Sequence, residues 1–173
     1  WKLLESLPRE AWPTFLRGDC AWGTEGAMSE AEAHGVKYLF KIKQSSNVKK
    51  LVQKLCRHAD WEPAGQGFSG AESTLKLMGW SRERRVVVLR RRLRDGVMVE
   101  KKNKKGQINL IVFGDEDQKY EYQVLVTSLT DDILTIAQHY RDRADCENNF
   151  DELKNQWGWS GFTTRDLKRC RIM

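Results

Sequence analysis

The chain has 173 residues and a net charge of +6, with 40% hydrophobic residues, 31% charged residues and only three prolines. This balance excludes a collagen-like, low-complexity or wholly disordered chain, and the length suits one domain or a core with one insertion. No apolar run approaches the roughly 20 residues that a membrane-spanning helix needs.

The basic residues are concentrated in one segment. Residues 82–105 hold 11 Lys and Arg against three Asp and Glu, a local balance of +8 in a chain of net charge +6. A concentrated patch of one sign favours polyanions, with nucleic acid as the first partner class and an anionic membrane surface as the second. The alternative is a solvated, charge-rich hairpin without a ligand.

The first part of the chain is predicted to form a strand–helix–strand unit. Residues 14–17 indicate a short strand, and residues 25–33 are rich in the helix formers Ala, Glu and Met. Gly35 stands where a glycine commonly ends a helix. Apolar residues and lysines then alternate across residues 36–43, which is the pattern of a strand with one buried face. Such a unit is the building block of α/β sheets, so the predicted fold class is α/β.

A second helix is predicted from Asn47 to His58, with apolar residues at helical spacing and Asn47 as the N-cap. Residues 60–73 are rich in Gly, Ala and Ser and are predicted to be a loop. Three strands are predicted after it: 86–93, 108–113 and 120–129. We therefore interpret residues 60–125 as a β-rich, basic insertion within the α/β core.

The last predicted element is a long helix from Thr130, its expected N-cap, to about Trp157. We expect Trp157 and Trp159 to pack beside the end of this helix. Trp80, in front of the basic segment, is also expected to pack. The alternative for all three is stacking on an unpaired base.

Four polar residues of this long helix share one face. At about 100° per residue, a sector of roughly 60° and a length of roughly 21 Å contain all four: Tyr140, Arg143, Glu147 and Lys154. Groups spread over that length cannot share one metal ion, but they can follow an extended ligand such as a nucleic-acid backbone. Arg and Lys would bind phosphates, and the Glu would be free to hold a metal. The alternative is an ordinary surface ion pair between Arg143 and Glu147.

Two motifs are similar to those of a known family. The intervals between the four residues on the helix face match a Tyr-Arg-Glu-Lys signature. Residues 16–23 resemble the strand-end block that carries the second catalytic Asp of the same family, here Asp19, and a helix and a strand follow it as they do there. The β-rich segment ahead of Glu147 resembles the characteristic insertion. The chain thus resembles, over nearly its whole length, bacterial insertion-sequence transposases with an RNase H-like DDE catalytic core.

This resemblance implies a partial RNase H-like core at residues 1–59 and 126–173, interrupted by the β-rich insertion at residues 60–125. It also implies an enzyme that cuts and joins transposon DNA ends by metal-dependent phosphoryl transfer. Asp19 and Glu147 would be both its catalytic residues and its ligands for two Mg²⁺ or Mn²⁺ ions, because carboxylate oxygens suit these cations.

The same resemblance implies that Tyr140, Arg143 and Lys154 contact DNA phosphates, joined by Arg90 and Arg92 of the basic segment. The implied partners are transposon inverted-repeat ends and target DNA, bound by a homodimer in the bacterial cytoplasm at the nucleoid, with no membrane partner. If the three consecutive arginines at 90–92 lie on a strand, at most two of them can share a face.

The chain departs from the family at the first catalytic Asp, which lies on a strand upstream of the second. Residues 1–18 contain no Asp. We therefore expect the chain to be truncated at both ends and inactive on its own. Two alternatives are a DNA-binding fragment without catalysis and an RNase H-like metal-dependent nuclease. A nuclease would cut without end specificity, whereas a pure binder would show only a steep salt dependence.

Overall fold

The computed structural model describes residues 1–93 and 120–155 of a chain that divides into two compact units, residues 1–138 and 139–173. The elements follow in this order: α1 (Lys2–Glu5), the 3-10 helix η1 (Arg9–Ala11), β1 (Phe15–Gly18), α2 (Glu25–Ala33), β2 (Lys37–Lys41), α3 (Ser46–His58), β3 (Glu62–Pro63), β4 (Phe68–Leu75), β5 (Arg84–Arg92), β6 (Tyr120–Thr127) and α4 (Ile133–Asn155). None of the described helices is long and apolar enough to cross a membrane. Three sequence predictions lie outside the described residues: the strand at 108–113, Trp157 and Trp159.

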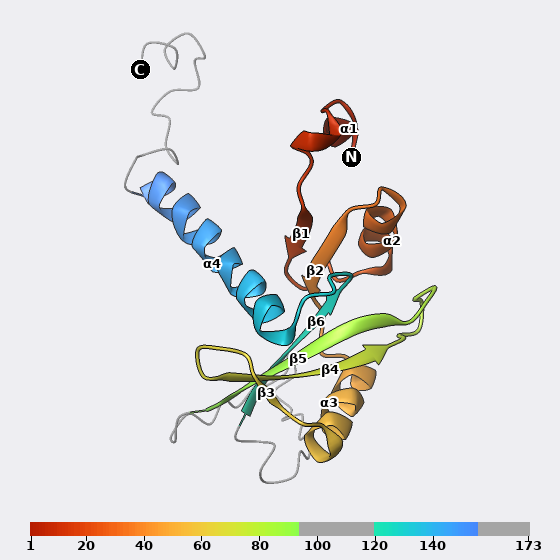
Figure 1. The fold of residues 1–173 in the computed structure, drawn as a ribbon, viewed down its shortest axis with the longest axis vertical. Helices are drawn as coiled ribbons and strands as arrows, with labels where there is room; N and C mark the ends of the chain where they lie inside the picture. The colour runs from red at the N-terminus through yellow and green to blue at the C-terminus, as the bar shows by residue number, and fades with distance from the viewer. Residues whose placement is uncertain (94–119, 156–173) are drawn as a thin grey trace, which may run out of the picture. The chain divides into compact units, whose positions relative to one another are not determined.

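The described strands of the first unit form one six-stranded sheet in the order β1-β2-β6-β5-β4-β3 (Figure 1). β1 and β2 are parallel, with Phe15 opposite Lys37 and Gly18 opposite Phe40. All other neighbouring strands in this sheet are antiparallel. The predicted α/β class is therefore confirmed as a mixed sheet combined with helices.

The strand–helix–strand unit β1–α2–β2 forms where the sequence predicts it. α2 begins after Thr24, whose hydroxyl accepts a hydrogen bond from the Ala27 amide at 3.4 Å. The chain leaves α2 through Gly35, which has a φ of +65° that other residues rarely adopt. The Val36 amide then donates to the Ala31 carbonyl at 2.9 Å. Capping at both ends thus sets the length of the helix and turns the chain into β2.

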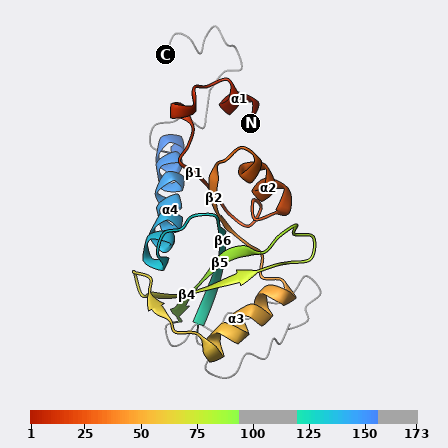
Figure 2. The same cartoon turned by 45° about the vertical axis from the view of Figure 1, so that its right-hand side comes forward.

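α2 and α3 cover one face of the sheet (Figure 2). Met28 of α2 and Val52 of α3 belong to the same buried cluster as Val86 and Val88 of β5 and Val124 of β6. Complete burial of one such side chain is worth about 1.5–3 kcal/mol. This face therefore holds the main core of the first unit.

The opposite face of the sheet packs against the beginning of α4. Val87 and Leu89 alternate with the core residues of β5 and are also buried. Ile133 and Ile136, in the first turns of α4, are buried as well. The central strands of the sheet are thus apolar on both sides, which explains their nearly continuous runs of Val and Leu.

The prediction of a loop at residues 60–73 is wrong, because β3 and β4 lie there and β4 pairs with β5 along eight residue pairs. A Cβ at Gly70 would lie 2.3 Å from Cγ2 of Ile133 and 3.2 Å from Cδ2 of Leu89. Ala71, its neighbour, is also fully buried. The small residues that suggested a loop are therefore needed for close packing within the sheet and against α4.

The predicted N-cap of α4 is also wrong, since the helix begins at Ile133 rather than after Thr130. Oδ1 of Asp132 accepts a hydrogen bond from the Thr135 amide at 2.6 Å, and this bond lowers the pKa of Asp132. A carboxylate at the positive end of a helix is a stronger acceptor than a hydroxyl, so the Asp caps the helix. The predicted N-cap of α3 is wrong as well, because Asn47 lies within the helix, which begins at Ser46 with Ser45 as its N-cap.

The strands β3, β4 and β5 of the predicted insertion, together with β6, which crosses its predicted boundary at residue 125, lie in the same sheet as β1 and β2. The insertion and the core strands therefore form one hydrogen-bonded layer in the described residues. The division of the chain into parts at residues 1–59, 60–125 and 126–173 stays a prediction.

Candidate active site

The predicted catalytic Asp19 is the first residue after β1. Because β1 and β2 are parallel, their carboxyl ends meet at one edge of the sheet, where ligands gather in α/β folds. Asp19 is partly exposed, and its Oδ1 accepts a hydrogen bond from the Ala21 amide at 2.9 Å. The Asp19 carbonyl accepts a second bond from the Trp22 amide at 3.1 Å. These bonds hold the carboxylate in a defined turn.

Two glycines allow this turn to pack closely. A Cβ at Gly18 would lie 2.7 Å from Cβ of Trp22, so only a glycine leaves room for the tryptophan. A Cβ at Gly23 would lie 2.4 Å from the carbonyl oxygen of Lys41, at the end of β2. The turn that carries Asp19 is therefore in close contact with both β1 and β2.

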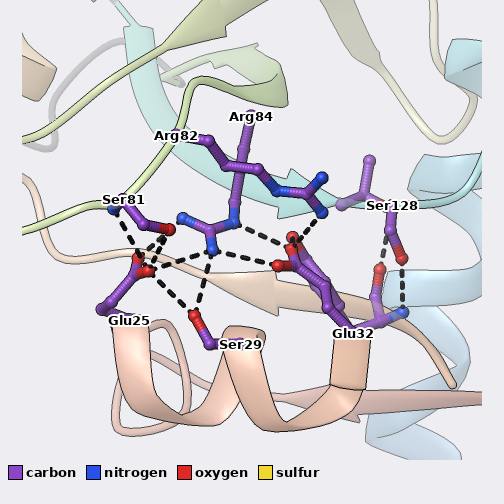
Figure 3. A network of polar contacts seen from close by, with 9 residues as sticks. Glu25, Ser29, Glu32, Ser81, Arg82, Arg84 and Ser128 are labelled. Atoms are coloured by element: carbon purple, nitrogen blue, oxygen red, sulfur yellow. Dashed lines mark hydrogen bonds and ion pairs between the residues drawn. The ribbon is translucent and has the colours of Figure 1, made fainter. Parts of the chain in front are cut away.

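The helix after the turn, α2, is attached to the sheet by the buried Arg84 of β5 (Figure 3). The Arg84 side chain is 2% exposed, and its nitrogens lie 2.7 Å from a Glu25 oxygen and 2.9 Å from a Glu32 oxygen. The hydrogen bond from Arg84 lowers the pKa of Glu25 to about 2. Burial alone would raise the pKa of Glu32, but hydrogen bonds from Arg84 and Arg82 outweigh burial and lower it to about 2. Both carboxylates therefore stay ionised and neutralise Arg84 within the protein.

The four residues of the predicted helix face all lie on α4: Tyr140, Arg143, Glu147 and Lys154. Since the helix is continuous, their spacing keeps them within a sector of roughly 60°. The guanidinium carbon of Arg143 lies 5.9 Å from the ring centroid of Tyr140. The side chains of Glu147 and Lys154 lie outside the described residues. These four residues belong to the second unit, and Asp19 belongs to the first.

Arg90, one of the two predicted arginines of the basic segment, is stacked between two aromatic rings. Its guanidinium carbon lies 3.9 Å from the ring centroid of Trp61 and 4.8 Å from that of Tyr120. In the part of the chain that the structure describes, the Nε atom of Arg90 and the Nε1 atom of Trp61 are buried without a hydrogen-bond partner. Stacking uses the faces of the guanidinium, so its remaining in-plane N–H donors can bind two oxygens of an acceptor such as a phosphate.

The neighbours of Arg90 alternate across the sheet as predicted for consecutive arginines on a strand. Arg91 forms an ion pair with Glu121 at 2.8 Å and lies over the ring of Phe68. Arg92 is exposed and, as the next residue but one, shares a face with Arg90. Among the described residues, a carboxylate thus pairs with Arg91 but with neither Arg90 nor Arg92.

Comparison with known families covers almost the whole chain. Residues 2–171 match the family described as transposase DDE domain group 1. The chain belongs to this family of DDE transposase domains. No curated protein matches it. At the level of the family, membership implies an enzyme of transposition that acts on DNA with divalent metal ions.

In a DDE transposase domain, carboxylate side chains are the expected ligands of the divalent metal ions. Among the described side chains, which do not include those of residues 144–147, no three His, Cys, Asp or Glu gather closely enough to hold a metal ion. Asp19 supplies oxygen donors of the type that Mg²⁺ and Mn²⁺ prefer. Its orientation by the Ala21 amide suits a ligand whose position is fixed before the metal binds. The donor type at Asp19 therefore fits a divalent ion, with Glu147 as the second predicted ligand.

Neither Trp61 nor Tyr120 is predicted as a site residue from the sequence. Trp61 stands between α3 and β3, and Tyr120 begins β6, so both reach Arg90 only through the pairing of the sheet. No local pattern signals such a stack. Trp80 is 8% exposed and lies in the core, which confirms that it packs and excludes a base contact.

The first unit of the transposase domain also has an open pocket of about 760 Å³. It lies between the end of α3, β4 and the residues before α4, and none of the predicted site residues lines it. Arg85, its most enclosed cation, donates to the Leu129 and Asp131 carbonyls and to the Glu72 carboxylate. The charge of Arg85 is therefore used within the protein, and the pocket is separate from the site around Asp19.

Proposed function

We propose that this DDE transposase domain supplies part of the active site of an enzyme that cuts and joins DNA at the inverted-repeat ends of a bacterial insertion sequence by metal-dependent phosphoryl transfer, and that the domain is inactive on its own. The observation that carries the proposal is the position of Asp19. This residue follows β1 directly, at the edge where two parallel strands end, within the segment that matches the family. The parallel β1–α2–β2 unit also supports an RNase H-like core interrupted by an insertion.

Asp19 and Glu147 are the proposed catalytic carboxylates and the ligands of Mg²⁺ or Mn²⁺. Two such ions, when bound, activate the attacking water or 3′-hydroxyl and stabilise the charge on the leaving oxygen. Asp19 is oriented for this role by the Ala21 amide and by the close packing of its turn. Glu147 is presented from a continuous helix, which limits the positions that its carboxylate can take.

Tyr140, Arg143 and Lys154 are the proposed contacts to the phosphates of the DNA end. Their common helix face follows an extended ligand over roughly 21 Å, about six nucleotides along one strand of B-DNA. Arg143 would bind one phosphate through two N–H donors, and Lys154 would attract another as a point charge. A homodimer would bind two such ends together with target DNA.

Arg90 and Arg92 are proposed to form a second DNA contact on one face of β5. Arg90 is held between Trp61 and Tyr120, and the described residues place no carboxylate in an ion pair with either arginine. A cation that is already positioned loses little conformational entropy on binding a phosphate.

Titration with Mn²⁺, followed by the electron paramagnetic resonance of the free ion, tests the two carboxylates in the full chain. We expect Asp19→Asn and Glu147→Gln each to weaken Mn²⁺ binding at least tenfold, because each removes one charged oxygen ligand. Glu152→Gln is the matched control for Glu147→Gln, since Glu152 is exposed on the same helix but off the shared face.

The Mn²⁺ affinity of Glu152→Gln should equal that of the unchanged chain. If Glu147→Gln behaved in the same way as Glu152→Gln, Glu147 would not be a metal ligand. Loss of Mn²⁺ binding in Glu147→Gln but not in Asp19→Asn would remove Asp19 from the site instead.

A second candidate function is DNA binding without catalysis. The stacked Arg90 favours it, because Arg90 offers a positioned cation to a phosphate. A pure binder would hold DNA with a steep dependence on salt and no dependence on Mn²⁺. Measuring DNA affinity with Mn²⁺ and with EDTA separates the two candidates, because only the catalytic one couples DNA binding to the metal.

A further inference from the structure

We infer that Trp22, in the turn that carries Asp19, stacks on an unpaired nucleobase of the DNA strand being processed. The inference rests on the proposed function, since it places the base next to the proposed catalytic carboxylate. It adds a binding site for one nucleotide to the phosphate contacts described above.

The exposure of Trp22 differs from that of the other described tryptophans. Trp22 is 60% exposed. The other four are partly or fully buried: Trp1, Trp12, Trp61 and Trp80. Single exposed apolar residues are common on protein surfaces, so exposure alone would carry no function. For Trp22 the rigidity of the turn and the charges around it add to the exposure.

The backbone of Trp22 is fixed on both sides. Its amide donates to the Asp19 carbonyl at 3.1 Å, and its carbonyl accepts from the Thr24 amide at 2.7 Å. Thr24 in turn caps α2. The Cβ end of the Trp22 side chain packs on Gly18. A Cβ at Gly18 would lie 2.7–2.9 Å from Cβ, Cγ and Cδ1 of Trp22. The indole is therefore anchored at one end and exposed at the other, an arrangement that lowers the entropic cost of stacking on a ligand.

Two lysines lie near the same edge of the sheet. Gly23 packs against the end of β2, where Lys41 and the exposed Lys43 lie. A carboxylate that suits a divalent ion and an exposed indole thus follow the end of β1, and two lysines lie at and just after the end of β2. These are the groups that recognise the parts of a nucleotide: cations for the phosphate and an aromatic face for the base. Because a base within a duplex has both faces covered, the base that stacks on Trp22 must be unpaired.

Binding of the full chain to two fluorescein-labelled DNAs tests the inference by fluorescence anisotropy. One DNA is a single-stranded oligothymidine, and the other is a blunt duplex of the same length. We expect Trp22→Leu to weaken single-strand binding roughly fivefold to a hundredfold, the range of one lost base stack, and to change duplex binding less than twofold. Trp22→Phe keeps an aromatic face and should retain most of the affinity. Met78→Ala, at a position 97% exposed elsewhere, is the control and should change neither.

Trp22→Leu keeps an apolar contact with Gly18, and a thermal unfolding curve shows whether each variant is folded. Unchanged single-strand affinity in Trp22→Leu would overturn the inference. So would an equal loss on both DNAs, which would assign Trp22 a structural role, or an absence of single-strand binding by the unchanged chain. The Mn²⁺ titration of Asp19→Asn stays informative in each of these cases, so the stacking role of Trp22 can fail while the proposed function stands.

Discussion

Strand β5 carries two immobilised arginines that are held in opposite ways. Arg84 is 2% exposed and lies between two glutamates that neutralise it. Arg90 is held by the rings of Trp61 and Tyr120, and within the described residues it forms no ion pair. One arginine is therefore neutralised within the fold, while the other carries a charge that no carboxylate of the described residues neutralises. The comparison teaches that the number of cations in a segment does not measure its capacity to bind a polyanion.

The same distinction applies to the rest of the basic segment. Most of its described arginines are paired with glutamates: Arg82 with Glu32, Arg84 with Glu25 and Glu32, Arg85 with Glu72, and Arg91 with Glu121. The local balance of +8 thus overstates the charge that the described part of the segment offers to DNA. Arg90 and Arg92 are the arginines of β5 on which a DNA contact should depend.

Replacing the buried arginine should have the largest effect. Arg84→Met removes the cation from between two ionised carboxylates, and breaking a buried ion pair in this way costs about 3–5 kcal/mol of the free energy of unfolding. Chemical denaturation measures this difference. Arg82→Met is the control, because Arg82 also pairs with Glu32 but has a side chain that is 59% exposed. An exposed pair of this kind contributes about 1 kcal/mol or less.

An Arg84→Met variant that lost no more stability than Arg82→Met would contradict the structural role of Arg84. The comparison between Arg84 and Arg90 would then have no basis in stability.

The free energy of unfolding should also decrease in acid, because the carboxylates of Glu25 and Glu32 then become protonated. The pKa values of Glu25 and Glu32 are about 2 in the folded chain, below the ordinary 4.5. Between these pH values the unfolded chain binds more protons, so the stabilisation is complete above pH 4.5 and is lost as the pH falls toward 2. Denaturation at a series of pH values should show this loss, and the curve of Arg84→Met should be flatter. If the stability curves of the unchanged chain and of Arg84→Met ran parallel against pH, Arg84 would not be the cause of the lowered pKa values of Glu25 and Glu32.

Replacing the stacked arginine should have the smallest effect on stability but a clear effect on DNA. Arg90→Gln should weaken duplex binding about tenfold and lower the slope of log affinity against log salt by about 1, as expected for one phosphate contact. Arg91→Gln is the control on the same strand, because Arg91 is already paired with Glu121. Equal losses in the two variants, measured by anisotropy over a range of salt concentrations, would show that the stacking of Arg90 has no bearing on DNA binding.

The elements that could be predicted from the sequence are those that depend on local patterns. The β1–α2–β2 unit follows from alternation and from capping by Thr24 and Gly35, which act within a few residues. β4 could not be predicted from its own sequence. Gly70 is needed there because Ile133 of α4 packs against it, and this contact joins residues that are far apart in the chain. Asp132 replaced the expected Thr130 as cap because both are capping residues and only the fold decides where the helix begins.

The candidate site likewise contains some residues that the sequence predicts and others that it does not. Asp19 is predicted by the resemblance of residues 16–23 to a strand-end motif of the family, and the four residues on one face of α4 are predicted by their spacing along the chain. The partners of Arg84 and Arg90 are not predictable, because α2 and Trp61 reach β5 only through the order and register of the sheet. A sequence shows which arginines are present, but the register of the strands decides which of them are neutralised.

The separation of the Asp19 and Glu147 carboxylates, measured in a crystal structure of the chain with Mn²⁺ and DNA, tests the central claim most directly. If these residues hold the catalytic metal ions, their oxygens should lie roughly 4–8 Å apart with Mn²⁺ bound between them. Arg143 and Lys154 should then contact the phosphates of the same DNA strand. A well-packed structure in which the two carboxylates lie far apart, or bind no common metal site, would contradict the assignment of Asp19 and Glu147 as the catalytic pair.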